Sequence, residues 1–194
     1  AYYPGSDTVP AIEEYAEAIT SAILNSQLNP RNLPTLILES GRALVDDAGY
    51  LHLAWGQHDN RLNYCRSISP GDLRMGDKLS MTGDQEDKVS YPEFYKFPNG
   101  DLLFLYRQGM SGNGNLIVNK YVTAEQKWYR LQTNLIDGEH TRNAYWQAFI
   151  DVNGVIHISW VWRESWNVAT NHDICYARSD DGGISWQKSN GEKN

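Results

Sequence analysis

The stretch Val152-Asn153-Gly154-Val155-Ile156-His157-Ile158-Ser159-Trp160 decides the fold of this chain. It begins with a glycine-containing turn and continues with apolar side chains at every second position. The same order recurs where Asp47-Ala48-Gly49 precedes Tyr50-Leu51-His52-Leu53-Ala54-Trp55, and where Pro98-Asn99-Gly100 precedes Leu102-Leu103-Phe104-Leu105-Tyr106. A glycine turn followed by a period of two predicts β-strands joined in hairpins.

These turns mark an internal repeat, because Gly49, Gly100 and Gly154 are spaced 51 and 54 residues apart. Leu62-Asn63-Tyr64-Cys65-Arg66-Ser67 also resembles Ile174-Cys175-Tyr176-Ala177-Arg178-Ser179 in the same phase. A repeat of roughly 50 residues with four short strands is typical of a β-propeller blade. A β-sandwich would explain the short strands but not so long a repeat. The predicted fold class is mainly β, a partial β-propeller of about three four-stranded blades with a short α/β segment at the N-terminus.

The chain divides into residues 1–49 and residues 50–194, at the point where the period changes. In the first part, apolar residues recur at helical spacing from Ile12 to Leu24, which predicts an amphipathic helix. Thr35-Leu36-Ile37-Leu38 predicts a short buried strand, and residues 41–48 predict a second short helix that Gly49 ends. The second part predicts propeller blades.

Bulk properties exclude several classes of partner. A formal net charge of −7 argues against nucleic acid, because such a chain does not neutralise phosphates. No apolar run approaches the roughly 18 residues that cross a membrane, so no membrane partner is predicted. The first ten residues lack the basic and apolar regions of a signal peptide, and the compartment stays unknown on this ground. Cys65 and Cys175 make no disulfide framework and are expected to be buried free thiols.

One local motif is specific. Ser179-Asp180-Asp181-Gly182-Gly183-Ile184-Ser185-Trp186 fits the pattern S-x-D-x-G-x-S-W. We expect the Asp181 carboxylate to accept backbone N–H groups across a turn, Gly183 to supply a positive φ, and Trp186 to pack beneath. The motif resembles the Asp box of bacterial-neuraminidase-repeat proteins, where it marks the fold and not the active site.

The resemblance to that family extends over residues 50–194. It resembles in particular the ulvan-lyase-type polysaccharide lyases, which implies a carbohydrate-active propeller that is secreted or periplasmic and acts on a polysaccharide or oligosaccharide. The stretches that carry the resemblance are Trp55–Tyr64, Ser90–Phe94, Tyr106–Asn115, Asn143–Gln147 and Trp162–Asp173. A fold of this kind does not by itself determine the substrate.

Residues 1–49 resemble a different family. Ile12–Ile19 and Pro34–Val45 are similar to the barrel domain of pyridoxal-phosphate-dependent arginine or diaminopimelate decarboxylases. Glu39, Gly41 and Arg42 match an element that lies near the cofactor phosphate in that family. No Schiff-base lysine motif accompanies them, so no cofactor is predicted. The sequence therefore predicts that segments of two different families are joined near residues 48–52.

The lyase resemblance implies β-elimination at a uronate and a catalytic set of His58, Tyr91 and Arg107. Tyr91 matches the family's proton-transfer tyrosine, Arg107 its carboxylate-binding arginine, and His58 a cleft histidine that acts as base or charge neutraliser. The family's second histidine, about 20 residues earlier, is absent, since Leu38 and Glu39 stand there. The structural alternatives are a buried tyrosine bonded to backbone, an ion pair between blades and a histidine in a surface loop.

Further residues are candidates for substrate binding through sugar stacking or contacts to carboxylate and sulfate groups, with packing between blades as the alternative. They are Asn113, Tyr145, Trp146, Arg163 and His172. No group of histidine, cysteine and aspartate has zinc-ligand spacing, so no metal is predicted, and a structural calcium ion in the Asp-rich turns is left open.

Two other functions stay open. A glycoside hydrolase of the same fold would need Glu93, Glu139 or Glu164 to face the cleft. A non-catalytic glycan-binding or structural fragment is the second, because about three blades do not close a propeller. Such a fragment exposes blade faces and strand edges, which predicts self-association.

Overall fold

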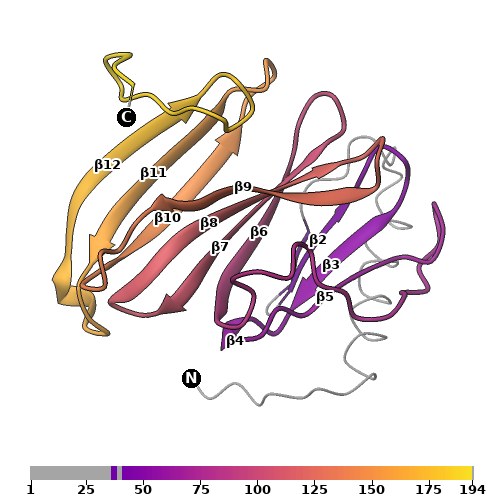
Figure 1. Ribbon diagram of the computed structural model, residues 1–194, viewed down its shortest axis with the longest axis horizontal. Helices are drawn as coiled ribbons and strands as arrows, with labels where there is room; N and C mark the ends of the chain where they lie inside the picture. The colour runs from indigo at the N-terminus through magenta and orange to yellow at the C-terminus, as the bar shows by residue number, and fades with distance from the viewer. Residues whose placement is uncertain (1–35, 39–40, 194) are drawn as a thin grey trace.

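The computed structural model describes residues 36–38 and 41–193 (Figure 1). Their regular structure is almost entirely antiparallel β-sheet, as predicted, and the one helical element among them is the short 3-10 turn η2 (Val168–Thr170). The strands are β1 (Leu36–Leu38), β2 (Gly41–Val45), β3 (Leu51–Trp55), β4 (His58–Asn60), β5 (Tyr64–Arg66), β6 (Val89–Lys96), β7 (Leu102–Met110), β8 (Asn113–Val122), β9 (Lys127–Ile136), β10 (Asn143–Ile150), β11 (Ile156–Arg163) and β12 (Asn171–Ser179).

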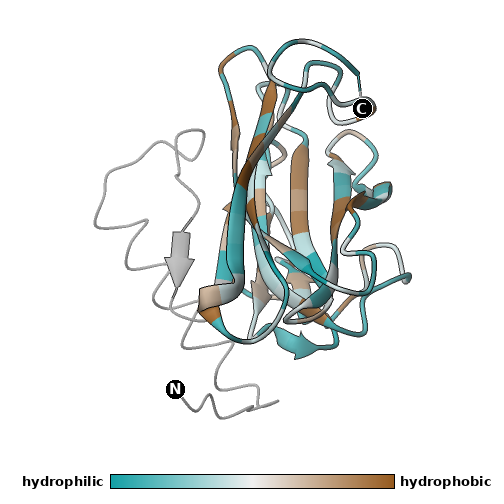
Figure 2. Ribbon diagram, turned by 90° about the vertical axis from the view of Figure 1, so that its left-hand side faces the viewer, coloured by the Kyte–Doolittle hydropathy of each residue, from teal (hydrophilic) through white to brown (hydrophobic). Residues whose placement is uncertain are grey.

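The strands form three sheets that follow one another along the chain. Sheet 1 has the order β1-β2-β3-β5, sheet 2 the order β4-β6-β7-β8-β9, and sheet 3 the order β10-β11-β12. Neighbouring long strands are consecutive and joined by hairpins, so each sheet is mostly a meander. In Figure 1 the sheets lie side by side from indigo to yellow, and Figure 2 views them from the side of sheet 3.

The repeated turns have a common geometry. Gly49, Gly100 and Gly154 have φ angles of 88°, 87° and 83°. Side chains other than glycine rarely adopt this left-handed region, which explains why the same residue recurs at the same point of each repeat.

The helix predicted over residues 41–48 is wrong. Gly41–Val45 form strand β2 and pair antiparallel with β3, with Ala43 opposite Leu53. Ala43 and Leu44 are both buried, and a segment with apolar side chains on both faces suits a strand held between two others. β1 bears out the short strand predicted there, whereas the helix predicted from Ile12 to Leu24 lies outside the described residues.

Two apolar cores lie between the sheets. Successive side chains of β7 serve both, because Phe104 and Tyr106 pack toward sheet 1 while Leu103 and Leu105 pack toward sheet 3. All four are fully buried. Sheet 2 is therefore apolar on both faces, and the next odd-numbered residue of β7, Arg107, points to the side of sheet 3.

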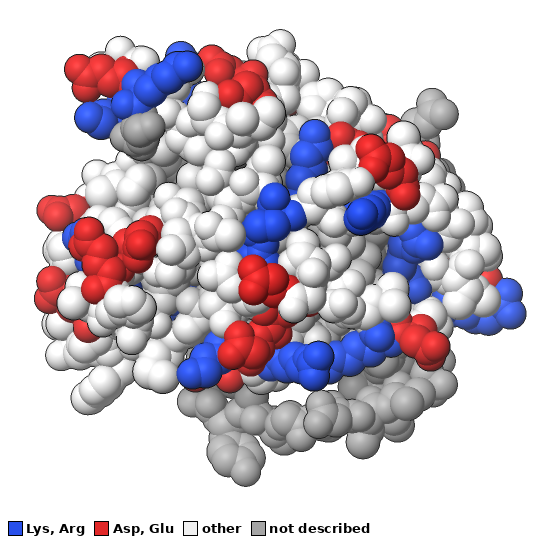
Figure 3. Space-filling model, viewed as in Figure 1, with Lys and Arg blue, Asp and Glu red and all other residues white. Residues whose placement is uncertain are grey.

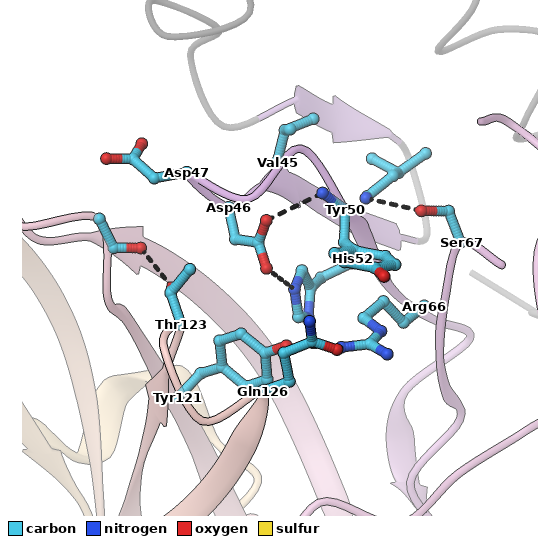
Figure 4. Close-up of polar contacts among 12 residues, drawn as sticks. Val45, Asp46, Asp47, Tyr50, His52, Arg66, Ser67, Tyr121, Thr123 and Gln126 are labelled. Atoms are coloured by element: carbon cyan, nitrogen blue, oxygen red, sulfur yellow. Dashed lines mark hydrogen bonds and ion pairs between the residues drawn. The ribbon is translucent and has the colours of Figure 1, made fainter. Parts of the chain in front are cut away.

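A chain of polar contacts is buried between sheets 1 and 2. The indole Nε1 of Trp128 can only donate, so it donates to the Tyr64 hydroxyl at 2.9 Å, and that hydroxyl donates to Nδ1 of His52 at 2.8 Å. His52 Nε2 then donates to Asp46 at 3.2 Å, a contact drawn in Figure 4. Burial lowers the pKa of His52, so the imidazole is neutral and structural.

Sheet 3 has an equivalent histidine, tyrosine and aspartate, but there the tyrosine is more exposed to solvent. Nδ1 of His157 lies 2.7 Å from the Tyr176 hydroxyl, and His157 Nε2 lies 3.9 Å from Asp151. These residues are the repeat equivalents of those around His52, but Tyr176 is 37 % exposed where Tyr64 is 2 % exposed. The difference arises because sheet 2 covers this face of sheet 1, while no described strand covers the corresponding face of sheet 3.

The Asp box folds as its residues predicted. Oδ1 of Asp181 accepts the backbone N–H groups of Ile184 and Ser185 at 3.0 and 2.9 Å. Gly183 has a φ of 94°, and the indole of Trp186 donates to the Gly183 carbonyl at 3.2 Å. Hydrogen bonds, first from the Ser185 side chain, lower the pKa of Asp181 to about 2, so the turn is held by a carboxylate.

Both cysteines are free thiols, Cys65 buried and Cys175 half-buried. No helix in the described ranges has the length and apolar character to cross a bilayer. On the face drawn in Figure 3, lysine and arginine side chains are interspersed with aspartate and glutamate.

Candidate functional site

The predicted site residues gather at one end of the sheets. Strands β6, β10 and β12 begin at this end and β7 and β11 finish there, at the lower left of Figure 1. Because the strands are antiparallel, positions near the start of one and the end of the next become neighbours. Tyr91, Arg107, Tyr145 and Arg163 come together in this way, from four strands of sheets 2 and 3.

Tyr91 is held out of the sheet by a strained backbone. Its φ is 55°, in the left-handed region, although it is not glycine and it precedes Pro92. The pairing of β6 with β7 shifts register at this point, between Ser90 and Glu93, which is a β-bulge. The ring is 38 % exposed. Strain of this kind in a folded chain is typical of functional sites, where a bulge aims a side chain.

Among the residues that the structure describes, Arg107 is the largest fully buried side chain, only 2 % exposed. Its Nη2 donates to the Ser90 hydroxyl at 3.1 Å and its Nε donates to the Gly109 carbonyl at 3.1 Å. Nη1 is buried without a hydrogen-bond partner, and no carboxylate of the described residues forms an ion pair with this guanidinium. A buried cation without a counter-charge is costly, so this position suits an anionic ligand.

Tyr145 and Arg163 adjoin this pair from sheet 3. The ring centroids of Tyr91 and Tyr145 are 5.6 Å apart, and the Arg107 guanidinium carbon lies 5.0 Å from the Tyr91 centroid. Arg163 donates from Nη1 to the Tyr145 hydroxyl at 3.1 Å and lies 4.1 Å from its ring centroid. Asn171 accepts a hydrogen bond from Arg163 Nε at 2.7 Å and so orients the guanidinium.

The two tyrosine hydroxyls have unlike surroundings. Burial, together with a hydrogen bond to Tyr145, raises the pKa of Tyr91 above its ordinary value. Burial also opposes ionisation of Tyr145, but its interactions with Ser111 and then Tyr91, together with the charges of Arg107 and Arg163, outweigh burial, so the pKa of Tyr145 is lowered. The same two arginine side chains act on both hydroxyls.

His58 lies at the edge of this group. It begins β4, is exposed, and meets the Tyr91 ring edge-on with the ring centroids 6.0 Å apart. The predicted histidine thus contacts the predicted tyrosine, from a strand that pairs with β6.

The other predicted binding residues are placed around the site or behind it. Asn113 is exposed at the tip of the β7–β8 hairpin, and His172 lies at the start of β12, with Nδ1 3.0 Å from Asp173. Trp146 follows Tyr145 in β10, so it points to the opposite face and donates from Nε1 to Glu93 at 3.1 Å. Within the ranges that the structure describes, no three histidine, cysteine or acidic side chains are grouped to hold a metal ion.

Sequence reasoning missed three residues that shape the site. The fully buried Ser90 hydroxyl accepts both the Asp59 N–H at 2.7 Å and the Arg107 guanidinium. Gly114 lies against the stem of Arg107, where a Cβ atom would stand 2.9 Å from the arginine Cγ. Trp166, 85 % exposed on the β11–β12 loop, presents a flat apolar ring at the same end. Only the glycine-rich run around Gly114 carried a local signal.

Comparisons with known proteins agree with this architecture. The family described as "BNR repeat-containing family member" matches residues 40–194. That match begins inside the decarboxylase-like stretch, and β2 joins sheet 1, so nothing supports a decarboxylase segment. The mosaic expected from the first 39 residues is not tested by this match, which begins at residue 40.

Curated relatives and a solved structure are similar over part of their length. The short isoform of ulvan lyase from Alteromonas sp. (strain LOR) is 33 % identical over 129 residues, 59 % of this chain and 24 % of that protein. A long isoform from Alteromonas sp. is 30 % identical, covering 13 % of its length. The crystal structure of polysaccharide lyase Uly1 superposes with a TM-score of 0.62 and 20 % identity, over 77 % of this chain and 42 % of that one. The chain thus spans less than half the length of each of these relatives.

Proposed function

Because the chain belongs to the BNR repeat-containing family, we propose that it is part of a carbohydrate-active β-propeller that cleaves a uronate-containing polysaccharide by β-elimination. Sheets 1 to 3 are then three successive blades. The observation that carries the proposal is the buried Nη1 of Arg107, unpaired beside two tyrosine rings. The carboxylate of a uronate would supply the missing counter-charge and hydrogen-bond acceptor.

The chemistry requires three tasks. A base removes the proton next to the uronate carboxylate, and that electron pair forms a carbon–carbon double bond as the glycosidic C–O bond breaks. An acid protonates the leaving oxygen, and a cation stabilises the enolate-like charge that develops on the carboxylate. Arg107 is positioned to stabilise the charge on the carboxylate. Tyr91, strained and exposed beside it, has the place for proton transfer.

A glycoside hydrolase is less well supported, because the three candidate glutamates do not lie together. Glu93 accepts hydrogen bonds from Tyr95 at 2.5 Å and from Trp146 at 3.1 Å, which is a packing role between sheets. Glu139 pairs with Arg142 at 2.7 Å, and Glu164 lies 3.4 Å from His172. Hydrolysis needs two carboxylates that flank one bond, and these three residues are engaged in separate contacts.

The decisive test is the ultraviolet absorbance of the product during incubation with a panel of uronate polysaccharides, ulvan included. We expect absorbance to rise with at least one polymer, because only elimination produces an unsaturated uronate. Tyr91→Phe should lower the rate by on the order of 100-fold or more, the usual contribution of a positioned acid or base.

Tyr129→Phe is the matched control, since Tyr129 is also 38 % exposed but lies on β9. It should leave the rate unchanged. Binding of a polymer without any rise in absorbance would replace the lyase proposal with the non-catalytic reading. New reducing ends without unsaturation would favour a hydrolase.

Gly114→Ala should impair the site without unfolding it. The added methyl group would meet Cγ of Arg107 at 2.9 Å and Cδ at 3.0 Å, so the guanidinium must shift. A displacement of this size costs on the order of 100-fold in rate when it moves a charge-stabilising group. The free energy of unfolding, measured in urea, should change by no more than about 2 kcal/mol.

Gly76→Ala is the control for this substitution, because Gly76 also has no positive φ and its Cβ would stand 3.2 Å from the Arg66 carbonyl oxygen, away from Arg107. The elimination rate of Gly76→Ala should match that of the wild type. Equal rates for both alanine variants would show that Gly114 does not set the position of Arg107.

A further inference from the structure

Three apolar side chains are exposed at the end of the sheets that carries the candidate site. They are Met110 at the end of β7, and Trp166 and Val168 on the loop that joins β11 to β12. Single exposed apolar residues are ordinary, whereas a group of them beside a site marks a binding surface. On the basis of the proposed function, we propose that Trp166 is a sugar-stacking residue, which binds a second pyranose ring of the polysaccharide whose uronate is held at Arg107.

The loop of Trp166 begins and ends at residues of the site. Arg163, which donates to the Tyr145 hydroxyl at 3.1 Å, is the last residue of β11. Asn171, which accepts from Nε of Arg163 at 2.7 Å, is the first residue of β12. Trp166 follows Arg163 by three residues, and three residues of chain extend at most about 11 Å. A polysaccharide bound in the site can therefore reach the loop with a neighbouring sugar.

Hydrogen bonds within the loop fix its shape. The Thr170 hydroxyl donates to the Asn167 carbonyl at 2.7 Å and accepts the Ser165 N–H at 3.3 Å. The Asn167 side chain accepts the Ala169 N–H at 3.0 Å, and the Asn167 N–H donates to the Ser165 hydroxyl at 3.1 Å. Trp166 lies between Ser165 and Asn167, so the backbone on both sides of it is held. A preorganised loop loses little conformational entropy when a ligand binds.

The β7–β8 hairpin supports this loop from sheet 2. A Cβ atom on Gly112 would stand 2.6 Å from the Glu164 carbonyl oxygen and 2.9 Å from Cα of Ser165, so the close approach requires glycine. The Gly112 N–H also donates to Oδ1 of Asn143 at 2.5 Å, which ties the hairpin to β10. Since β7 carries Arg107 and leads into this hairpin, the strand that holds the buried cation also supports the loop of Trp166.

The composition of the loop suits an uncharged ring. None of the six side chains from Ser165 to Thr170 is charged. The C–H groups of a pyranose ring form an apolar face that packs on an indole, while its hydroxyl groups stay in contact with water at the rim. Arg107 then supplies charge for the uronate, and Trp166 supplies apolar area for a neighbouring sugar, so the site binds the polymer over more than one unit.

The first experiment measures binding without cleavage. Electrophoresis in native gels that contain ulvan, or another polymer of the panel that retards the protein, gives the Kd of each variant in a Tyr91→Phe background. Trp166→Ala should raise the Kd about 10-fold, and Trp166→Phe should raise it much less, because a phenyl ring restores most of the apolar contact. Because Trp166 is 85 % exposed, its loss should leave the urea unfolding curve unchanged.

Phe149→Ala is the matched control, since Phe149 is also exposed on sheet 3 but lies near the far end of β10, opposite His157. Its Kd should equal that of the Tyr91→Phe parent. An unchanged Kd in Trp166→Ala, or an equal rise in Phe149→Ala, would overturn the assignment. The effect of Trp166→Ala should also persist in about 0.5 M NaCl, because stacking on an uncharged ring is not screened by salt. Its disappearance in that salt would contradict stacking.

The second experiment varies the length of the substrate, with oligosaccharides prepared from the polymer that is cleaved. Trp166→Ala should lower kcat/KM about 10-fold for oligosaccharides that reach the loop and should leave the shortest cleaved substrate unaffected. An equal loss at every length would indicate a general structural effect and overturn the second subsite. Absence of elimination by the wild type, with a polymer still bound, would overturn the proposed function, while the comparison of Kd values still decides the role of Trp166.

Discussion

Replacing Arg107 with glutamine lowers the rate of elimination by on the order of 100- to 1,000-fold, the loss expected when one charge-stabilising group is removed. The guanidinium is 2 % exposed, so water cannot replace it. Its unpaired Nη1 is the only nitrogen of the group that has no partner in the fold, since Nε and Nη2 are engaged by Gly109 and Ser90. The effect should fall mainly on kcat, because the enolate-like state carries more charge on the carboxylate than the bound substrate does.

The same variant should fold normally. The variant loses the hydrogen bonds to Ser90 and Gly109, but it also removes a buried cation that has no counter-ion. These two effects offset each other, so the free energy of unfolding should change by no more than about 1 kcal/mol. Arg130→Gln is the matched control, since Arg130 also lies against a tyrosine ring, 5.9 Å from the Tyr106 centroid, but on β9. Its rate should equal that of the wild type. An Arg107→Gln variant with undiminished kcat would remove the main support for a carboxylate at this position.

Tyr64→Phe lowers the free energy of unfolding by about 2–4 kcal/mol, the largest stability effect we expect from the loss of one oxygen atom. That hydroxyl accepts from Trp128 at 2.9 Å and donates to His52 at 2.8 Å, both inside the core between sheets 1 and 2. Without it, an indole N–H and an imidazole nitrogen are left buried and unpaired. Each such group costs about 1–3 kcal/mol.

The internal repeat supplies the control for this prediction. Tyr176→Phe removes the equivalent hydroxyl, which lies 2.7 Å from His157, but Tyr176 is 37 % exposed. Water can replace its hydrogen bond, so the change should stay within about 0.5 kcal/mol. Urea unfolding of both variants beside the wild type measures the two effects. Similar losses in the two variants would contradict the explanation by burial.

Much of the secondary structure could be predicted from local patterns. The period of two after Gly49, Gly100 and Gly154 located β3, β7 and β11, because a glycine turn and alternating side chains need no distant partner to be recognised. The Asp box was equally local, since the bonds of Asp181 reach only to residues three and four positions ahead. The same period of two would have placed Tyr145 and Trp146 on opposite faces of their strand, an inference that the sequence alone allowed.

The candidate site depended on contacts between distant segments. The sequence by itself determined that the chain repeats as short antiparallel strands, and its family resemblance marked Tyr91, Arg107 and Tyr145 as candidates. Only the tertiary structure decided that residues 41–45 form a strand, that Arg107 is buried without a counter-charge, and that Tyr145 meets Tyr91. The physical reason is that burial and charge pairing are set by side chains 50 or more residues away, as Tyr145 is from Tyr91. Local propensity carries no information about which of them will meet.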